Sequence, residues 1–221
     1  MQKIKKELSL AKVYKSWLDG LSKDNKDHPE YKSATRFYYD VVANLLWVQK
    51  GLCAYTEMYL VDLKHVNPKE WKKGRFNKFE FLGHLDHYDS SLKSKKGWEW
   101  NNFFVVHSDV NVKRKGSKKV NGILKPDEGQ FSPFYFLQYD FKTHCFVPNS
   151  EREFDLQRKI LEDINVLGLN FRPIIDYRRE YLMPIIDDVL IGKSTLNEAR
   201  TKLFQFYTSF EMIVKELSIQ K

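Results

Sequence analysis

Apolar residues recur with helical spacing towards both ends of the chain and with strand spacing in its middle. The positions from Ile4 to about Leu21 predict an amphipathic helix, and those from Ala34 to Lys50 predict a helix that is apolar on nearly all sides. A charged segment that contains Pro29 separates the two. The second helix should therefore be buried, whereas the first should pack as an arm.

The middle of the chain predicts a strand, a loop, a second strand and a helix. Residues 78 to 85 and 101 to 107 alternate well enough to indicate the strands, and the loop between them is rich in lysine, serine and glycine. Ser108 or Asp109 suits the capping position of a short basic helix that follows. A polar residue stands at each junction of these elements.

The rest of the chain predicts one hairpin and three helices. These are an aromatic hairpin over residues 131 to 147 with its turn near 140 to 143, a helix capped by Ser150 and Glu153 that ends near Leu167 at Gly168, a helix that starts at Pro173 and bends at Pro184, and a last helix that starts at Thr195 with Glu198. The last helix carries a narrow apolar seam of Leu196, Ala199, Leu203, Phe206, Phe210, Ile213 and Leu217. Such a seam suits an antiparallel helix or a partner chain.

Together these elements predict an α+β protein. The chain has 221 residues, of which 42% are hydrophobic, and this is enough to bury a core. We expect three parts in one compact unit: N-terminal helices in residues 1–50, the strand, loop, strand and helix core in residues 51–120, and the aromatic hairpin with the C-terminal helices in residues 121–221.

Charge and cysteine content narrow the expected setting. The chain carries 37 basic and 29 acidic residues, a formal charge of +8, which favours a polyanionic partner, although an ordinary basic protein has the same balance. Two cysteines indicate no disulfide framework and fit a reducing compartment. No leader peptide and no apolar run long enough to span a bilayer is apparent, so a cytoplasmic protein without membrane association is expected.

The candidate chemistry lies at the junctions of the central elements. The hairpin and the start of the helix could bring Asp86, His87 and Asn111 together. A carboxylate, an imidazole and an amide at one point are what phosphodiester hydrolysis with a single hard cation requires. His87 would be the general base, and Asp86 with Asn111 would hold Mg²⁺ or Mn²⁺. The alternative is an Asp-His pair that merely ends a strand at the surface.

This stretch resembles the HNH (ββα-metal) nuclease motif, in the variant whose last residue is Asn. The matching residues are Asp86 with His87, Trp100-x-Asn102 and Asn111-x-x-Arg114. Three flanking segments fall in the order of that family, at residues 51 to 57, 124 to 127 and 167 to 170. Over residues 35 to 180 the chain resembles the PtuB-type nucleases of Septu and retron-associated antiphage defence systems.

The resemblance implies more than the residues do alone. It implies a ββα-metal core embedded in a mostly helical protein, service as an antiphage effector, and a PtuA-type ATPase partner for which the apolar seam is one candidate docking surface. It also implies that Asn102 ties the loop after His87 to the second strand and thereby orients the base.

A structural Zn²⁺ is not expected. Relatives commonly bind zinc through two Cys-x-x-Cys pairs. Here the first pair reads Cys53-Ala-Tyr-Thr56, and the positions of the second read His107 and Val110. Two of the four ligands are thus lost, although a set of Cys53, His107 and His84 stays an alternative. Apolar packing is expected to fill the space.

Basic residues flank the candidate site on both sides. Those expected to contact phosphates, in a salt-dependent and sequence-independent way, are Lys93, Lys95, Lys96, Lys113, Arg114 and Lys115. We expect the substrate to be DNA rather than RNA. The chain lacks a phosphate-binding Gly-x-x-x-x-Gly-Lys loop, a Gly-x-Ser-x-Gly elbow and a deaminase Pro-Cys-x-x-Cys. Two rivals stay open: a binding or structural subunit whose nuclease site has decayed, and a stand-alone restriction-type endonuclease.

Overall fold

The computed structural model describes residues 1–32 and 36–217, and within them the chain is α+β, as predicted. The helices are α1 (Lys12–Lys23), α2 (Tyr38–Val48), α3 (Pro133–Phe136), α4 (Phe154–Val166), α5 (Arg172–Leu190), α6 (Leu196–Lys202) and α7 (Tyr207–Glu216). Two antiparallel sheets are formed by β1 (Gly83–His87) with β2 (Phe103–His107) and by β3 (Leu137–Asp140) with β4 (Cys145–Pro148). Five short elements complete the described chain: 3₁₀ helices η1 (Leu63–His65), η2 (Pro68–Glu70), η3 (Ser90–Lys93) and η4 (Trp100–Asn102), and the π-helix η5 (Val110–Lys115).

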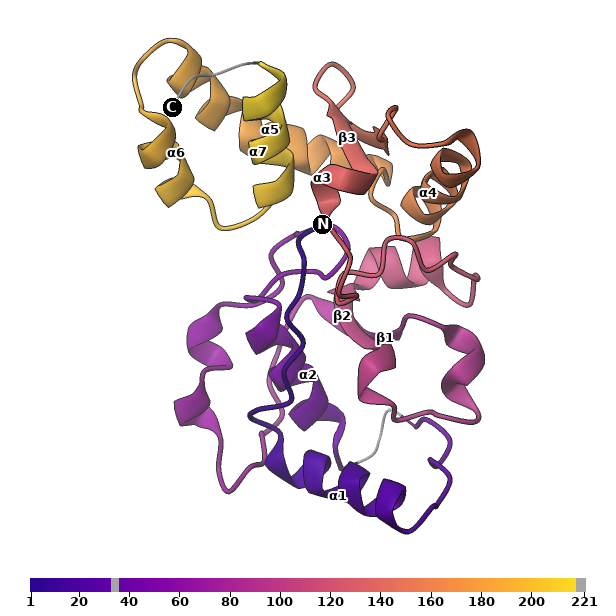
Figure 1. The fold of residues 1–221 in the computed structure, drawn as a ribbon. Coiled ribbons are helices and arrows are strands. Elements are labelled where there is room, and N and C mark those ends of the chain that lie inside the picture. The colour runs from indigo at the N-terminus through magenta and orange to yellow at the C-terminus, as the bar shows by residue number, and fades with distance from the viewer. Residues whose placement is uncertain (33–35, 218–221) are drawn as a thin grey trace.

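The first hairpin lies between an N-terminal and a C-terminal group of helices (Figure 1). α1 and α2 lie at one end, and α4 to α7 with the second hairpin lie at the other. One cluster of buried apolar side chains runs through the whole arrangement and includes Val41 from α2, Phe104 from β2 and Phe210 from α7. The three stretches expected from the sequence therefore share a core.

β2 is the most deeply buried strand of the first hairpin. Its residues from Phe103 to Val106 have no exposed surface, which requires covering elements on both faces. α2 covers one face, and Gln49 just after that helix bonds Val105 in both directions, with its amide donating to the carbonyl at 2.8 Å and its carbonyl accepting from the amide at 3.0 Å. α2 is buried nearly all round, as its apolar pattern predicts.

The N-terminal arm differs from the prediction. The helix expected from Ile4 begins only at Lys12, and the preceding residues form an extended arm in which the Ile4 amide donates to the Pro126 carbonyl at 2.8 Å. The side chain of Asn44 accepts from the amides of Leu10 and Ala11. These contacts fix the chain before α1 in a non-helical path. The expected start of the second helix at Ala34 lies outside the described residues.

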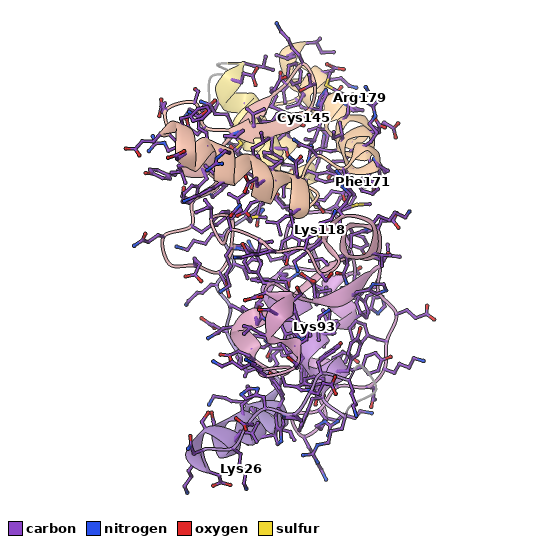
Figure 2. The ribbon with its side chains drawn as sticks, turned by 90° about the vertical axis from the view of Figure 1, so that its right-hand side faces the viewer. Lys26, Lys93, Lys118, Cys145, Phe171 and Arg179 are labelled. Atoms are coloured by element: carbon purple, nitrogen blue, oxygen red, sulfur yellow. The ribbon has the colours of Figure 1, made fainter. Side chains whose placement is uncertain are left out.

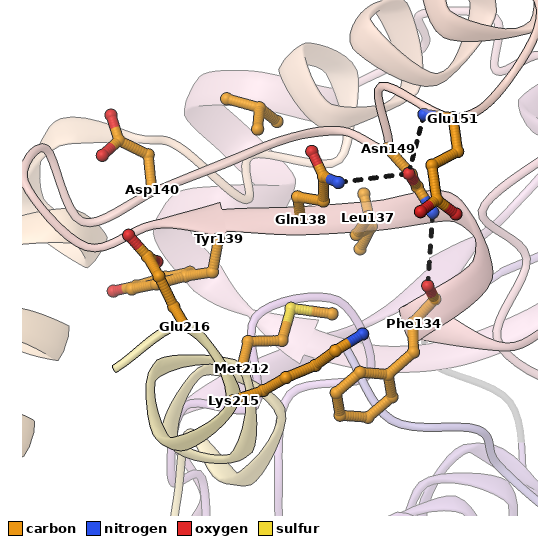
Figure 3. Close-up of a pocket in the computed structure, with 11 residues that line it drawn as sticks. Phe134, Leu137, Gln138, Tyr139, Asp140, Asn149, Glu151, Met212, Lys215 and Glu216 are labelled. Carbon is orange, nitrogen blue, oxygen red and sulfur yellow. Dashed lines mark hydrogen bonds between the residues drawn. The ribbon is translucent and has the colours of Figure 1, made fainter. Parts of the chain in front are cut away.

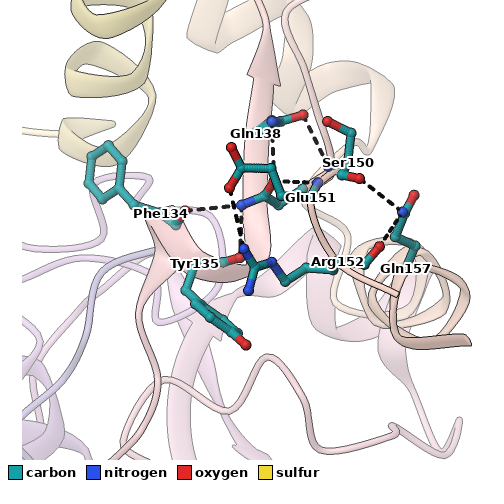
Figure 4. Close-up of polar contacts among 8 residues, drawn as sticks. Phe134, Tyr135, Gln138, Ser150, Glu151, Arg152 and Gln157 are labelled. Carbon is teal, nitrogen blue, oxygen red and sulfur yellow. Dashed lines mark hydrogen bonds and ion pairs between the residues drawn. The ribbon is translucent and has the colours of Figure 1, made fainter. Parts of the chain in front are cut away.

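The second hairpin and the helix after it largely follow the sequence. β3 and β4 pair around a turn at residues 141 to 144, and α4 ends at a glycine, Gly168, with a φ of +70°. The cap expected from Ser150 and Glu153 does not form. Ser150 instead donates its amide to Gln138 and accepts from Gln157 through its carbonyl (Figure 4). The Thr195 and Glu198 capping box is present.

The last helix is broken in two, which corrects the prediction of one continuous helix. α6 ends at Lys202, where Leu203 is extended, and α7 starts after Phe206, which has a left-handed φ of +56°. Its amide donates to the Glu57 carbonyl at 3.3 Å, so a tertiary contact fixes the break. Most of the apolar seam is buried within this chain, at Leu196, Ala199, Leu203, Phe206, Phe210 and Ile213, and is therefore not a free docking surface for an ATPase.

A buried carboxylate joins the C-terminal helices to the segment that follows the central motif. Asp163 on α4 has no exposed surface and accepts from the amides of Asn121, Ile123 and Leu124 at 2.7, 3.0 and 3.2 Å. These amides have no strand or helix partner. Asp163 therefore satisfies a loop that would otherwise bury unpaired donors.

We expect Asp163→Ala to lower the free energy of unfolding by roughly 3 kcal/mol, because buried amides that lose a charged acceptor are left unsatisfied. Urea denaturation measures this change. Arg158→Ala, an exposed position of the same helix, is the control and should change it by less than about 0.5 kcal/mol. Equal effects of the two substitutions would contradict the proposed role of Asp163.

Candidate active site

Asp86 and His87 are the last two residues of β1 and lie opposite Phe104 and Phe103 of β2. Consecutive side chains of a strand point to opposite faces, so the carboxylate and the imidazole lie on either side of the hairpin. Both side chains are buried, at 3% and 1% exposure. This burial excludes the alternative of an Asp-His pair at a surface strand end.

Two side chains hold the carboxylate of Asp86. The Tyr55 hydroxyl donates to one oxygen at 2.6 Å, and the Lys115 ammonium lies 3.3 Å from the other. Lys115 also donates to the His87 carbonyl at 2.6 Å and has no exposed surface. Burial raises the pKa of Asp86, while the Lys115 ammonium and the Tyr55 hydroxyl act in the opposite direction.

The helix that delivers Lys115 is a π-helix directly after β2. Its wide turn is closed by the Gly116 amide, which donates to the Asn111 carbonyl at 2.7 Å, five residues back. π-Helices are rare in proteins, and those that occur are often found at functional sites. Asn111 lies at its start, half-buried, and its side chain makes no hydrogen bond within the described part of the chain. The side chain of this helix that contacts Asp86 is therefore Lys115 rather than Asn111.

His87 is held as a neutral imidazole. Its Nε2 donates to the Gly97 carbonyl at 2.9 Å, because a carbonyl can only accept, and this leaves Nδ1 as the unprotonated nitrogen. Burial lowers the pKa of His87 to about 4. The ring lies edge-on against Tyr31 and Phe103, with centroid distances of 4.5 and 4.7 Å. An oriented neutral imidazole is the form that a general base needs.

Gly97 serves both the imidazole and the segment that covers it. A Cβ on this residue would lie 2.4 Å from the Tyr31 amide nitrogen and 2.6 Å from the Lys93 carbonyl oxygen. Only glycine therefore lets residues 29 to 31 pack against the loop. Tyr31, which is half-buried, consequently covers one side of the His87 ring.

Asn102 makes the tether that the sequence resemblance implies. Its side-chain carbonyl accepts from the Asp89 amide at 2.7 Å, and its side-chain amide donates to the Asp89 carbonyl at 2.9 Å. The Asn102 backbone carbonyl also accepts from the Tyr88 amide. The loop after His87 is thus fastened to the start of β2 through one 5% exposed side chain.

The basic residues expected to contact phosphates separate into two groups. Lys93 and Lys95 are exposed, Lys96 is 3.4 Å from Glu99, and Lys113 is 3.0 Å from Asp109 (Figure 2 shows Lys93 beside the hairpin).

The other two basic residues face the interior. The Arg114 guanidinium packs over the Phe171 ring at 5.3 Å. Lys115 is buried against Asp86, so the expectation that it contacts phosphate is wrong for this conformation. Its charge is committed to the carboxylate.

The residues around Cys53 form an apolar packing site. The Cys53 sulfur accepts from the His107 amide at 3.3 Å, and Tyr55, Phe103 and Val110 are fully buried. No group of three or more His, Cys, Asp or Glu side chains suited to a metal occurs within residues 1–32 and 36–217.

Asp86 and Asn111 offer the oxygen donors that Mg²⁺ prefers, but the conformation does not fit a divalent cation. One carboxylate oxygen already faces the Lys115 ammonium, and the other accepts from Tyr55. A second cation beside Asp86 would meet Lys115 at close range. It could bind there only if Lys115 moved away.

A pocket of about 480 Å³ lies between β3 and α7 (Figure 3). Leu137, Met212 and Lys215 line it together with other residues, none of which is a predicted site residue.

Comparison with protein-family models found no match, and neither did a search of curated proteins. No helix in the described part of the chain is long and apolar enough to cross a membrane.

Two of the residues that build the site, Tyr55 and Gly97, were not predicted as site residues, and Lys115 was predicted for another role, the contact with phosphate. Tyr55, Gly97 and Lys115 contact Asp86 or His87 only through the tertiary fold. Tyr55 lies in the segment 51 to 57, and the resemblance of that segment to an HNH entry turn is the one signal that pointed to it. A lysine at the end of a basic helix carries no comparable signal.

We expect wild-type stability to fall as the pH drops from 7 to 5. The pKa of His87 is depressed in the folded state, so the unfolded chain, with an ordinary pKa of 6.5, binds the proton first. The contribution of this residue is therefore complete above pH 6.5 and decreases by roughly 2 kcal/mol at pH 5. His87→Gln, which keeps a side-chain donor, should lack that part of the pH dependence in urea titrations. Identical pH dependences of the two proteins would contradict the buried neutral imidazole.

We expect Lys115→Met to unfold more easily in EDTA, by roughly 3 to 5 kcal/mol, because it leaves a buried carboxylate unpaired. Mg²⁺ or Mn²⁺ should then raise its melting temperature in calorimetry, since the position beside Asp86 becomes open to a cation. The wild type and Lys113→Met, an exposed control on the same helix, should show a smaller rise. An equal rise in all three proteins would mean that the ion binds without displacing Lys115.

Proposed function

We propose that this protein hydrolyses phosphodiester bonds of nucleic acid, with His87 as the general base. The observation that carries the proposal is the state of His87: a neutral imidazole, fixed through Nε2 to the Gly97 carbonyl, with Nδ1 left to accept a proton. It follows directly on Asp86, and the Lys115 ammonium donates to the His87 carbonyl and to the Asp86 carboxylate. Base and cationic group thus share one strand end.

In this proposal Nδ1 of His87 takes the proton from a water molecule as its oxygen attacks phosphorus. The bond from phosphorus to the 3′ oxygen breaks, the leaving oxygen takes up a proton from solvent water, and His87 later releases its proton to solvent. Gly97 stabilises the imidazolium that forms, because its carbonyl accepts from Nε2. Asn102 acts through position, since its bonds to Asp89 hold the loop after His87.

The resemblance to HNH nucleases implies Mg²⁺ or Mn²⁺ as cofactor. Asp86 and Asn111 would hold such an ion, and it would have to displace Lys115 from the carboxylate. The structure in its present conformation favours the lysine. The proton transfer assigned to His87 rests on the imidazole and on Gly97 and is independent of which cation faces Asp86.

The substrate class rests on charge. The net charge of +8 and the exposed lysines 93, 95 and 96 near the hairpin loop suit a polyanion and carry no base-reading element. Charge does not distinguish DNA from RNA, so the proposal of DNA as the substrate rests on the resemblance alone. An antiphage role with an ATPase partner is proposed on the same ground, without the apolar seam as its docking surface.

A second candidate is a nucleic-acid-binding subunit whose nuclease site has decayed. One observation favours it: the position beside Asp86 is filled by a buried ammonium, and His87 is covered. A decayed site and a closed active site share this geometry. They differ in whether any condition gives cleavage.

We expect purified wild-type protein to nick plasmid DNA or cleave a single-stranded substrate, and His87→Ala to reduce the rate by roughly a hundredfold or more, which is the usual contribution of a general base. A time course with Mg²⁺, with Mn²⁺ and with EDTA measures this. His65→Ala, an exposed histidine on η1, is the matched control and should keep the wild-type rate.

Equal rates for wild type and His87→Ala would contradict the assignment of the base. Inactivity of the wild type on DNA and RNA under all conditions, with an ATPase partner added, would favour the decayed subunit. Cleavage only at defined sequences without a partner would favour a stand-alone restriction-type enzyme.

A further inference from the structure

A short turn carries the carbonyl that holds the imidazole of His87. The Glu99 amide donates to the Lys96 carbonyl at 3.0 Å, so Gly97 and Trp98 are the two central residues of this turn. Neither has a positive φ, which fits a turn of type I. The hydrogen bond of the turn fixes its shape but not its place relative to β1. That place has to come from contacts with other elements.

Tyr14 of α1 makes one of these contacts. Its hydroxyl donates to the Trp98 carbonyl, which is next to the Gly97 carbonyl along the chain. The structure describes all of α1, and Tyr14 is the one buried residue of that helix. Burial raises the pKa of Tyr14, so the hydroxyl keeps its proton and stays a donor. The contact of α1 with the turn is therefore a directed hydrogen bond.

Aromatic rings extend this contact to the imidazole. The Tyr14 ring meets the Trp98 ring at a centroid distance of 6.5 Å. Trp98 in turn lies 5.1 Å from Tyr31 and 5.8 Å from Phe103. The His87 ring packs against these last two rings. Trp98 thus links Tyr14 to both groups that orient the imidazole, the acceptor of Nε2 and the rings beside it.

We propose that Tyr14 is a positioning residue for the base. Its hydroxyl holds the Trp98 carbonyl and thereby keeps the neighbouring Gly97 carbonyl in line with Nε2 of His87. This fixes the tautomer in which Nδ1 is free to accept a proton. The inference rests on the proposed hydrolysis and adds to it a residue that lies outside the candidate motif. Tyr14 acts through the turn and touches neither the imidazole nor the substrate.

The first test is spectroscopic and requires no cleavage. Tyr14→Phe removes only the hydroxyl, so the imidazole nitrogen signals of His87 in NMR spectra at neutral pH should change from one fixed tautomer to a mixture of two. A para-aminophenylalanine at position 14 supplies a donor again and should restore the wild-type signals. Tyr207→Phe is the matched control. Tyr207 also donates its hydroxyl to a carbonyl, that of Leu203 at 2.8 Å, and lies at the other end of the molecule (Figure 1).

The second test is the dependence of the cleavage rate on substrate concentration. Tyr14→Phe should lower kcat by roughly tenfold and leave KM unchanged, because a displaced base slows the reaction step and not substrate binding. Tyr207→Phe should keep the wild-type values of both.

Unchanged His87 signals in Tyr14→Phe would overturn the proposal. Equal changes in Tyr14→Phe and Tyr207→Phe would overturn it too, since a general loss of stability would then be the cause. These outcomes are separable from the fate of the hydrolase. A tautomer that depends on Tyr14 in a protein that cleaves nothing sustains the positioning and rejects the catalytic role of His87, whereas cleavage with a tautomer that ignores Tyr14 does the reverse.

Discussion

The contact of Lys115 with Asp86 and the His87 carbonyl is the interaction on which the rest of the site depends. It joins the end of the π-helix to the end of β1 and so sets the helix against the hairpin. All three groups are almost completely buried. A buried ion pair offsets the cost of removing its charges from water only when it has good geometry and further hydrogen bonds. Tyr55 supplies one of these bonds and thereby completes the environment of the carboxylate.

The opposite face of the hairpin is organised by the loop between the strands. Gly97 accepts from the imidazole, and its missing side chain gives room for Tyr31 to cover the ring. Asn102 fastens the other end of the same loop. The two faces of the hairpin thus carry different chemistry. One face has a charge pair and the other a neutral, oriented imidazole, although Asp86 and His87 are consecutive residues of β1.

Local patterns predicted what local physics decides. The second strand, the glycine after α4 and the Thr195 capping box are set within a few residues, and the structure contains them, whereas the first strand spans residues 83 to 87 instead of the predicted 78 to 85. The polar residues at the strand ends were likewise visible in the sequence, whereas the tether of Asn102 was implied only by the resemblance.

What the sequence could not predict depends on partners far along the chain. Lys115 meets a carboxylate 29 positions away, and a lysine in a basic helix is ordinarily solvated. The break at Phe206 requires the Glu57 carbonyl, and the late start of α1 requires Asn44. In the last two cases long-range hydrogen bonds outweigh the local helical preference.

The contacts of Glu57 affect the order in which parts of the fold can form during synthesis. This 2% exposed residue, in the turn that leads towards the motif, accepts from the Thr208 amide at 2.9 Å and through its carbonyl from Phe206. The neighbouring Tyr59 amide donates to Gln205. During synthesis the entry turn therefore waits for partners that leave the ribosome some 150 residues later. Until then the turn before the hairpin lacks its contacts with Gln205, Phe206 and Thr208. A chain truncated before these residues would therefore contain an incompletely packed candidate site.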